Sequence, residues 1–314
     1  MASDGMSPAS LYAILTAELV SFLVAAAALS YCRRSTGPAH TLALVGMTPL
    51  IPSRLGTIVL AVLRGGFCAV LVVVSARSIT RSPDLTYFTI WNLLLQTAYF
   101  GIAALAGVVL LVRGPGGAGE HWGARIVYRG FCVCVPCSVY VSLVTWCVLL
   151  PQAVQSGNSA LVAVLVGPLS WFQHLANTCL LLVDFCANSM LIHSSAVVFL
   201  VGWIVAYVVS SWVSFAVLGY WPYFFLVLSS NTPVVYFGFA MLAVLLFGLA
   251  MCASALKQWL LGARLDVHAK THVLHEAPVG PASREVFGSL VPTMVNERPW
   301  REHETISTHS HSEV

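Results

Sequence analysis

Charged residues are scarce in this sequence. Asp, Glu, Lys and Arg together make up 9% of the 314 residues, whereas 58% are hydrophobic and the mean hydropathy is +0.85. A soluble domain carries about 25% charged residues. So few charges could not cover the surface of a chain this long in water. The apolar surface is therefore predicted to face lipid.

Basic clusters are also missing. The net charge is only +3 and no run of Lys and Arg occurs, which argues against nucleic-acid binding. The glycine-rich stretch Gly114–Gly119 lacks the lysine of a phosphate-binding loop, so no nucleotide is expected. Met1–Pro8 holds no Lys or Arg, so the first apolar run is expected to stay as a signal-anchor helix.

Cysteine is present, but not in a metal-binding pattern. Cys132, Cys134 and Cys137 form a C-x-C-x-x-C motif that could suggest zinc. No second ligand pair lies nearby, and Phe, Val and Tyr flank the motif. We interpret these residues as small buried hydrophobic side chains. No metal or other cofactor is expected.

Long apolar stretches dominate the chain. A spanning helix needs about 20 apolar residues. The sequence predicts an all-α polytopic membrane helix bundle of six or seven transmembrane helices, at about Ser10–Tyr31, Leu55–Ser75, Tyr87–Val112, Gly130–Leu150, Ala160–Phe185, Ser195–Leu218 and Pro233–Leu256. Thr41–Ile51 is too short to span and is interpreted as interfacial or re-entrant. The aromatic run Tyr220–Phe225 is typical of a membrane interface.

Orientation and domains follow from the polar residues. Lys and Arg gather in the loops that share a side with the C-terminus, which predicts an N-out, C-in topology. Residues 1–256 are expected to form the bundle and 257–314 a disordered cytoplasmic tail. We interpret His268, His272 and His275 as part of this solvated tail rather than a metal site. Ser312-Glu313-Val314 has the form of a terminal motif that a partner protein could capture.

Two predicted helices carry polar stripes. In the third helix, Thr89, Asn92 and Gln96 share one face at offsets of three and seven. The fifth helix repeats this pattern with a longer stripe, which consists of His174, Asn177, Asp184 and Asn188. Polar groups are costly in lipid. Both stripes are therefore predicted to look inward onto a shared polar cavity.

Two charges lie in other predicted spans, Glu18 in the first and Arg64 in the second. A lone charge inside a membrane is expensive, so each is expected to have a partner. The simplest pairs are Glu18 with Arg64, or Arg64 with Asp184. We interpret Arg64 as belonging to a structural ion pair that supports the cavity.

A hydroxyl beside an imidazole is the minimal nucleophile–base pair. Thr89 and His174 can play these two parts, and Asn92 or Asn177 could orient the ring or bind an oxyanion. Asp184 is ten residues from His174, about 15 Å along a helix, and is too distant to orient the ring. Thr89 and His174 can meet if the fifth helix begins late, near Val166 and Pro168.

At these residues the sequence resembles a known family. The run Tyr87–Gly101, YFTIWNLLLQTAYFG, is similar to a signature of the androgen-induced-gene and rolling-stone superfamily. The run Trp171–Phe185, WFQHLANTCLLLVDF, resembles that family's second signature, in which a histidine precedes an acidic residue by ten positions. Trp221–Ser230 and Arg64 also resemble the family. The resemblance covers about residues 55–256.

The resemblance implies two activities. Its androgen-induced branch comprises intramembrane hydrolases that split fatty acid esters of hydroxy fatty acids, with a threonine nucleophile and an essential histidine; these fall on Thr89 and His174. The rolling-stone branch is linked to cell–cell fusion. This chain departs from the hydrolases in having Asp184 where they carry glutamate, and in an added N-terminal helix and tail.

The sequence thus favours a lipid-ester hydrolase that receives its substrate from membrane lipids. The alternative is a non-enzymatic membrane protein in adhesion or fusion, and a transporter or receptor is a third interpretation. The chain shows no retention or lipidation signal, so it favours neither the endoplasmic reticulum nor the plasma membrane.

Overall fold

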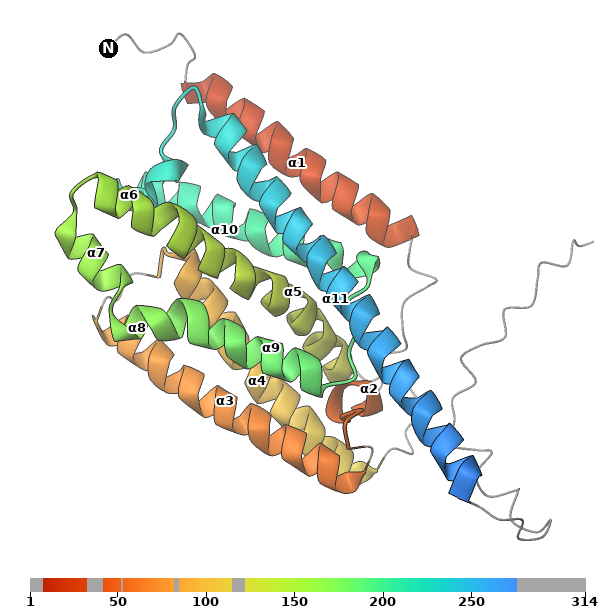
Figure 1. Cartoon of the computed structure of the whole chain (residues 1–314). Coiled ribbons are helices and arrows are strands. Elements are labelled where there is room, and N and C mark those ends of the chain that lie inside the picture. The colour runs from red at the N-terminus through yellow and green to blue at the C-terminus, as the bar shows by residue number, and fades with distance from the viewer. Residues whose placement is uncertain (1–7, 33–41, 52, 82–84, 115–121, 276–314) are drawn as a thin grey trace, which may run out of the picture. The chain divides into compact units, whose positions relative to one another are not determined.

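The computed structural model describes residues 8–32, 42–51, 53–81, 85–114 and 122–275. The chain divides into two units, Met1–Ala263 and Arg264–Val314, and the first holds the helix bundle. All regular structure in the described residues is helical, which confirms the predicted all-α bundle (Figure 1). The glycine-rich stretch at Gly114–Gly119 lies mainly outside the described residues.

Six helical stretches of the described residues are long and apolar enough to cross a membrane: Tyr12–Tyr31, Arg54–Arg81, Phe88–Arg113, Trp122–Gln155, Ser194–Leu218 and Thr232–Gly262. A bent pair, Ser159–Leu165 with Pro168–Ala187, adds a seventh if it is one span. This agrees with the predicted six or seven. The N-out, C-in orientation remains a prediction.

The first spans lie close to their predicted positions, as α1 (Pro8–Cys32), α3 (Arg54–Arg81) and α4 (Phe88–Arg113). The fourth predicted span is longer than expected. It comprises α5 (Trp122–Val144), a π-helical segment η2 (Thr145–Leu149) and α6 (Leu150–Gln155). In η2 the N–H of Leu150 bonds to the carbonyl of Thr145, five residues earlier. A π turn of this kind widens the helix locally.

The fifth predicted span is broken. α7 (Ser159–Leu165) and α8 (Pro168–Trp171) meet at a bend of 49°, because Gly167 precedes a proline and takes an extended conformation. A second π-helical segment, η3 (Phe172–Ala176), then leads into α9 (Asn177–Ala187). The helix that carries His174 therefore begins at Pro168, as the pairing of Thr89 with His174 requires.

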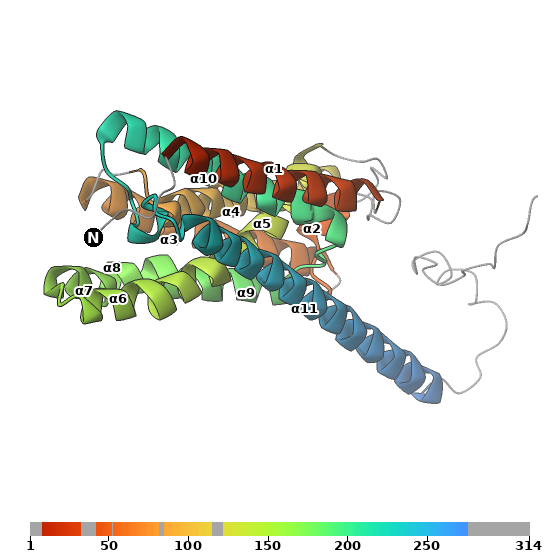
Figure 2. The same cartoon turned by 90° about the horizontal axis from the view of Figure 1, so that it is seen from above.

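Helices α4 and α5 lie at the centre of the bundle. α4 contacts α2 (Leu42–Gly46), α3 and α5, and α5 also contacts α9 and α10 (Val197–Leu218). α1 packs along α10 (Figure 2). α11 (Thr232–His275) joins them through aromatic pairs, Phe22 with Phe237 and Tyr140 with Phe239. α4 and the stretch that begins with α5 are accordingly the most buried of the six spanning stretches, with 39% and 50% of their apolar windows inside the protein.

The described part of the short apolar segment, Leu42–Ile51, is buried around Val45 and Thr48 and exposed at Leu50 and Ile51. It contains α2, which packs against α4 and α5. Val45 within it is fully buried, and Gly46 lies so close to α4 that an added Cβ would be 2.8 Å from Leu110 Cδ2. Of the two predicted placements, this packing favours a re-entrant piece over an interfacial one.

The predicted change of character near Gly262 does not end the last helix. α11 continues to His275 and includes His268, His272 and His275. The predicted boundary between bundle and tail at 256/257 therefore falls within a continuous helix. Residues 276–314, with the terminal Ser312–Val314 motif, lie outside the described residues.

Glycine allows a close backbone approach at the start of α3. A Cβ built on Gly56 would lie 1.9 Å from the carbonyl oxygen of Ile51 and 2.8 Å from Thr48 Cγ2. We expect Gly56→Ala to lower the stability of the purified protein by about 1–3 kcal/mol or more, since the neighbouring atom is backbone and cannot rotate away. Thermal unfolding in detergent, followed by tryptophan fluorescence, measures this change.

Gly66, on the same helix, supplies the matched control. Nothing lies within 4 Å of the Cβ that alanine would add there. Gly66→Ala is therefore expected to leave the unfolding temperature unchanged or to raise it slightly, because alanine favours a helix interior. Equal unfolding temperatures for the two variants would contradict the packing described at Gly56.

Candidate functional site

Both polar stripes point into the bundle. Asn92 and Gln96 of α4 are fully buried, and so is Asp184 of α9. His174 and Asn177 are 5% and 1% exposed. The prediction that these faces look inward is confirmed. The stripes do not form one site, however, because the contacts of Asp184 and those of His174 involve different residues.

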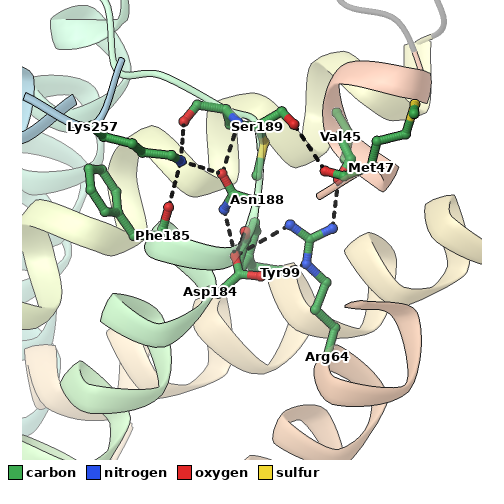
Figure 3. Close-up of polar contacts among 10 residues, drawn as sticks. Val45, Met47, Arg64, Tyr99, Asp184, Phe185, Asn188, Ser189 and Lys257 are labelled. Carbon is green, nitrogen blue, oxygen red and sulfur yellow. Dashed lines mark hydrogen bonds and ion pairs between the residues drawn. The ribbon is translucent and has the colours of Figure 1, made fainter. Parts of the chain in front are cut away.

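Asp184 lies at the centre of a buried polar cluster (Figure 3). Arg64 Nε donates to Asp184 Oδ1 at 2.6 Å, and Tyr99 Oη donates to Oδ2 at 2.5 Å. Another nitrogen of Arg64, Nη1, donates to the carbonyl of Val45 at 2.7 Å. Both ionic side chains are fully buried. Of the two predicted pairings, Arg64 with Asp184 is therefore confirmed, and it ties α2, α3, α4 and α9 together.

Lys257 extends this cluster to α11. Its ammonium group donates to the carbonyls of Phe185 and Met190, at 2.5 and 3.0 Å, and to Asn188 Oδ1 at 3.2 Å. The Asn188 amide nitrogen in turn donates to Asp184 Oδ2 at 3.1 Å. The cation lies at the C-terminal end of α9, where it satisfies carbonyls and complements the helix dipole. Every ionic group here has partners, which is the arrangement of a structural cluster.

A cavity of about 90 Å³ lies between α1, α4, α5, α10 and α11. Aromatic and aliphatic side chains form most of its wall. The lining residues that carry polar groups are Glu18, Thr89, Thr145, Tyr140, Tyr207, Tyr223 and Tyr236. Glu18 therefore faces this cavity and does not pair with Arg64.

A buried hydroxyl–imidazole pair borders the cavity. Thr145 Oγ1 lies 3.1 Å from His174 Nδ1, and Thr145 is only 1% exposed. Thr145 opens the π segment η2, and His174 lies in the π segment η3. The carbonyl of His174 accepts hydrogen bonds from the hydroxyls of Ser142 and Thr178. The contact of Thr145 with His174 joins the two π segments, and the hydrogen bond from Ser142 joins α5 to η3.

Thr89 is placed differently from its predicted role. It is half-buried and lines the cavity, and its hydroxyl lies 3.5 Å from the phenol of Tyr223. Burial raises the pKa of Tyr223 to about 12, so this phenol keeps its proton at neutral pH. The hydrogen bond described for the His174 ring goes to Thr145. The pairing of Thr89 with His174 therefore stays a prediction.

Asn92 and Gln96 lie one and two turns along α4 from Thr89. Neither amide has a hydrogen-bond partner among the described residues. Buried amides in native proteins are almost always paired with protein or with ordered water. Asn177 does not orient the His174 ring either; its Oδ1 accepts from Thr178 at 3.3 Å. The predicted orienting role of these amides has no contact to support it.

The described residues contain no group of three or more His, Cys, Asp and Glu that could hold a metal ion. Cys132, Cys134 and Cys137 are buried in the hydrophobic core, as their interpretation as small apolar side chains requires.

Three residues of the site were not predicted from the sequence as members of it. Thr145 is an isolated hydroxyl in an apolar run, and nothing in the sequence marks the π turn that directs it. Tyr223 was expected at the membrane interface with its aromatic neighbours, but it lines the cavity with Phe225. The sequence predicts Glu18 only as an ion-pair partner. Its position in an otherwise apolar helix is the signal that could have placed it at an internal cavity.

The ion pair yields a stability prediction. Asp184→Leu leaves Arg64 buried without its counter-charge, and such a loss typically costs about 3–5 kcal/mol. We therefore expect a large fall in the unfolding temperature of Asp184→Leu, measured on purified protein in detergent. Adding Arg64→Met to this variant should recover much of the lost stability, since the unpaired cation is then also removed.

An exposed cation elsewhere would show no such rescue. The control is Arg54→Met, because Arg54 is exposed and donates only to the carbonyl of Leu111 at 3.2 Å in the contacts described for it. Combining Arg54→Met with Asp184→Leu should leave the unfolding temperature as low as in Asp184→Leu alone. If the Arg64→Met double variant is no more stable than Asp184→Leu alone, the pair does not have the assigned role.

No family model, curated protein or solved structure matches this chain. The resemblance of Tyr87–Gly101 and Trp171–Phe185 to known signatures therefore remains a hypothesis that rests on those residues. The helices themselves are sufficient for a coarser conclusion. Their number, length and apolar character make this chain an integral, multi-pass, all-α membrane protein, with a set of polar side chains buried among its helices.

Proposed function

We propose that this protein hydrolyses a lipid ester inside the membrane, with His174 as the general base and a threonine hydroxyl of the cavity as the nucleophile. The observation that carries the proposal is the contact of 3.1 Å between a buried imidazole and a hydroxyl that lines an apolar cavity. An imidazole in this position can take the proton of the hydroxyl as its oxygen attacks a carbonyl.

The shape of the cavity supports a lipid substrate. Its volume of about 90 Å³ is small beside the roughly 300–1,000 Å³ of typical ligand pockets. It has room for an ester group and a few adjoining methylenes. The acyl chains of a lipid would continue between helices, where apolar side chains meet apolar chains. Glu18, Leu19 and Phe22 of α1 form part of the wall, which suggests entry from the bilayer beside this helix.

Hydrolysis also needs water in an apolar bundle. Asn92 and Gln96 offer donors and acceptors that have no partner among the described residues, on the same face of α4 as Thr89. These amides can hold a water molecule near the cavity and remove the penalty of their burial, which is about 1–3 kcal/mol for each unpaired group. No metal or nucleotide enters the proposed reaction.

Replacing the proposed base tests this function. We expect His174→Gln to lower hydrolysis of a medium-chain p-nitrophenyl ester by about 10²–10⁴-fold, since glutamine cannot accept the proton. The assay uses the full chain, purified and reconstituted in nanodiscs, and follows release of p-nitrophenolate. Labelling by an alkyl fluorophosphonate should fall in parallel.

His193→Gln is the matched control, because His193 is half-buried and lies outside the residues that line the cavity. It should hydrolyse the ester at the rate of the unaltered protein. Equal losses in both variants would point to a general structural effect. A protein that retains its unfolding transition but neither hydrolyses esters nor takes the label has no hydrolase activity. That result would favour the non-enzymatic role in adhesion or fusion.

A further inference from the structure

We infer that Thr145 is the nucleophile that His174 activates, and that Thr89 and Tyr223 together bind the carbonyl oxygen of the substrate. This inference rests on the proposed ester hydrolysis and assigns its parts. The resemblance to known hydrolases implies Thr89 as the nucleophile. The contacts of the two threonines favour the opposite assignment.

The direction of the Thr145 hydroxyl supports its assignment as the nucleophile. Threonines in apolar helices commonly donate to the carbonyl four residues earlier, which occupies their proton. Thr16, Thr80 and Thr97 do so here, with distances of 2.7, 2.9 and 2.8 Å. The contact described for Thr145 instead joins its Oγ1 to a ring nitrogen at 3.1 Å. A nucleophile requires this orientation, because its proton has to pass to the base.

The local geometry of the two helices supports the same assignment. Thr145 and His174 lie on different helices, and each lies in a π-helical segment. π turns are rare and frequently mark functional sites. In η3 the N–H of Asn177 bonds to Phe172, five residues earlier, as Leu150 bonds to Thr145 in η2. Two such turns that face each other at one hydroxyl–imidazole pair indicate that the pair is the feature they position.

The contact described for the Thr89 hydroxyl is with a second hydroxyl, that of Tyr223, and not with the imidazole that a nucleophile needs. Thr89 Oγ1 lies 3.5 Å from Tyr223 Oη, and both side chains line the cavity that Thr145 also lines. Because burial raises the pKa of Tyr223 to about 12, the phenol remains a donor at neutral pH. Two neutral donors on the cavity wall suit an oxygen that gains negative charge.

The reaction then proceeds in two balanced steps. Thr145 Oγ1 attacks the ester carbonyl carbon, its proton passes to His174 Nδ1, and the negative charge on the carbonyl oxygen is stabilised by Thr89 and Tyr223. The C–O bond to the alcohol breaks, and His174 returns the proton to the departing alkoxide. A water molecule attacks the resulting acyl-Thr145 and gives its proton to His174. The acid is released as Thr145 regains this proton.

The test locates the label of a long-chain alkyl fluorophosphonate on the full protein in nanodiscs. Peptide mass spectrometry of the unaltered protein should place the phosphonyl group on Thr145. Labelling should be lost in Thr145→Val, which has nearly the same shape, and should return in part in Thr145→Ser, which restores the hydroxyl. Ester hydrolysis should fall by about 10³-fold or more in Thr145→Val.

Two other threonines serve as references. Thr89→Val should still take the label on Thr145, with a rate lowered by about 10–10³-fold, because only a donor is lost. Thr97→Val should behave as the unaltered protein, since Thr97 lies on α4 and its hydroxyl donates to Leu93. The unfolding temperature of each variant, measured in parallel, identifies any variant that fails to fold.

The inference and the proposed function fail in different ways. A phosphonyl group on Thr89, with labelling retained in Thr145→Val and lost in Thr89→Val, overturns the assignment of Thr145 but supports a hydrolase. Labelling at any other residue that stays unchanged in Thr145→Val also overturns the assignment of Thr145 as the nucleophile. An unaltered protein that takes no label and hydrolyses no ester overturns the proposed function, and the assignment with it.

Discussion

A buried ionic group in an apolar bundle is costly unless it is paired, and the pairing of Arg64, Asp184 and Lys257 organises the described part of the chain. Arg64, Asp184 and Lys257 would each be costly inside a membrane alone. Together they join four helices and the short α2, and every ionic group has at least one partner within 3.2 Å. The cluster fixes how α3, α4, α9 and α11 are placed relative to one another. The cavity at the far end of the polar stripes depends on that placement.

The two ends of the stripes differ in how completely their polar groups are paired. At Asp184 the carboxylate oxygens accept from an arginine, a tyrosine and an asparagine, and the side chain is fully buried. Around the cavity, a threonine contacts an imidazole and Glu18 Oε2 has no partner among the described residues. Polar groups whose hydrogen bonds are all made favour stability, whereas groups that can still form hydrogen bonds are available for binding or catalysis. The proposed division into a structural end and a reactive end follows from this contrast.

The backbone contributes to the reactive end as much as the side chains do. Gly167 and Pro168 break the span so that a new helix starts close before His174. Thr145 opens one π segment and His174 lies within the other, and the two side chains are in contact. One added residue in a turn shifts every later side chain by about 100°, so the π turn around His174 affects the direction of the side chains that follow it.

The sequence by itself determined the fold class, the approximate spans and the inward direction of the two stripes, because apolar length and helical periodicity are local properties. It left Arg64 with two possible partners, Glu18 and Asp184, and the structure decided for Asp184. The sequence also placed Thr89 and His174 among the candidates. Only the tertiary structure decided which hydroxyl the imidazole contacts. Thr145, Tyr223 and Glu18 come from three different parts of the chain, and their meeting depends on helix packing and on π turns that no residue pattern announces.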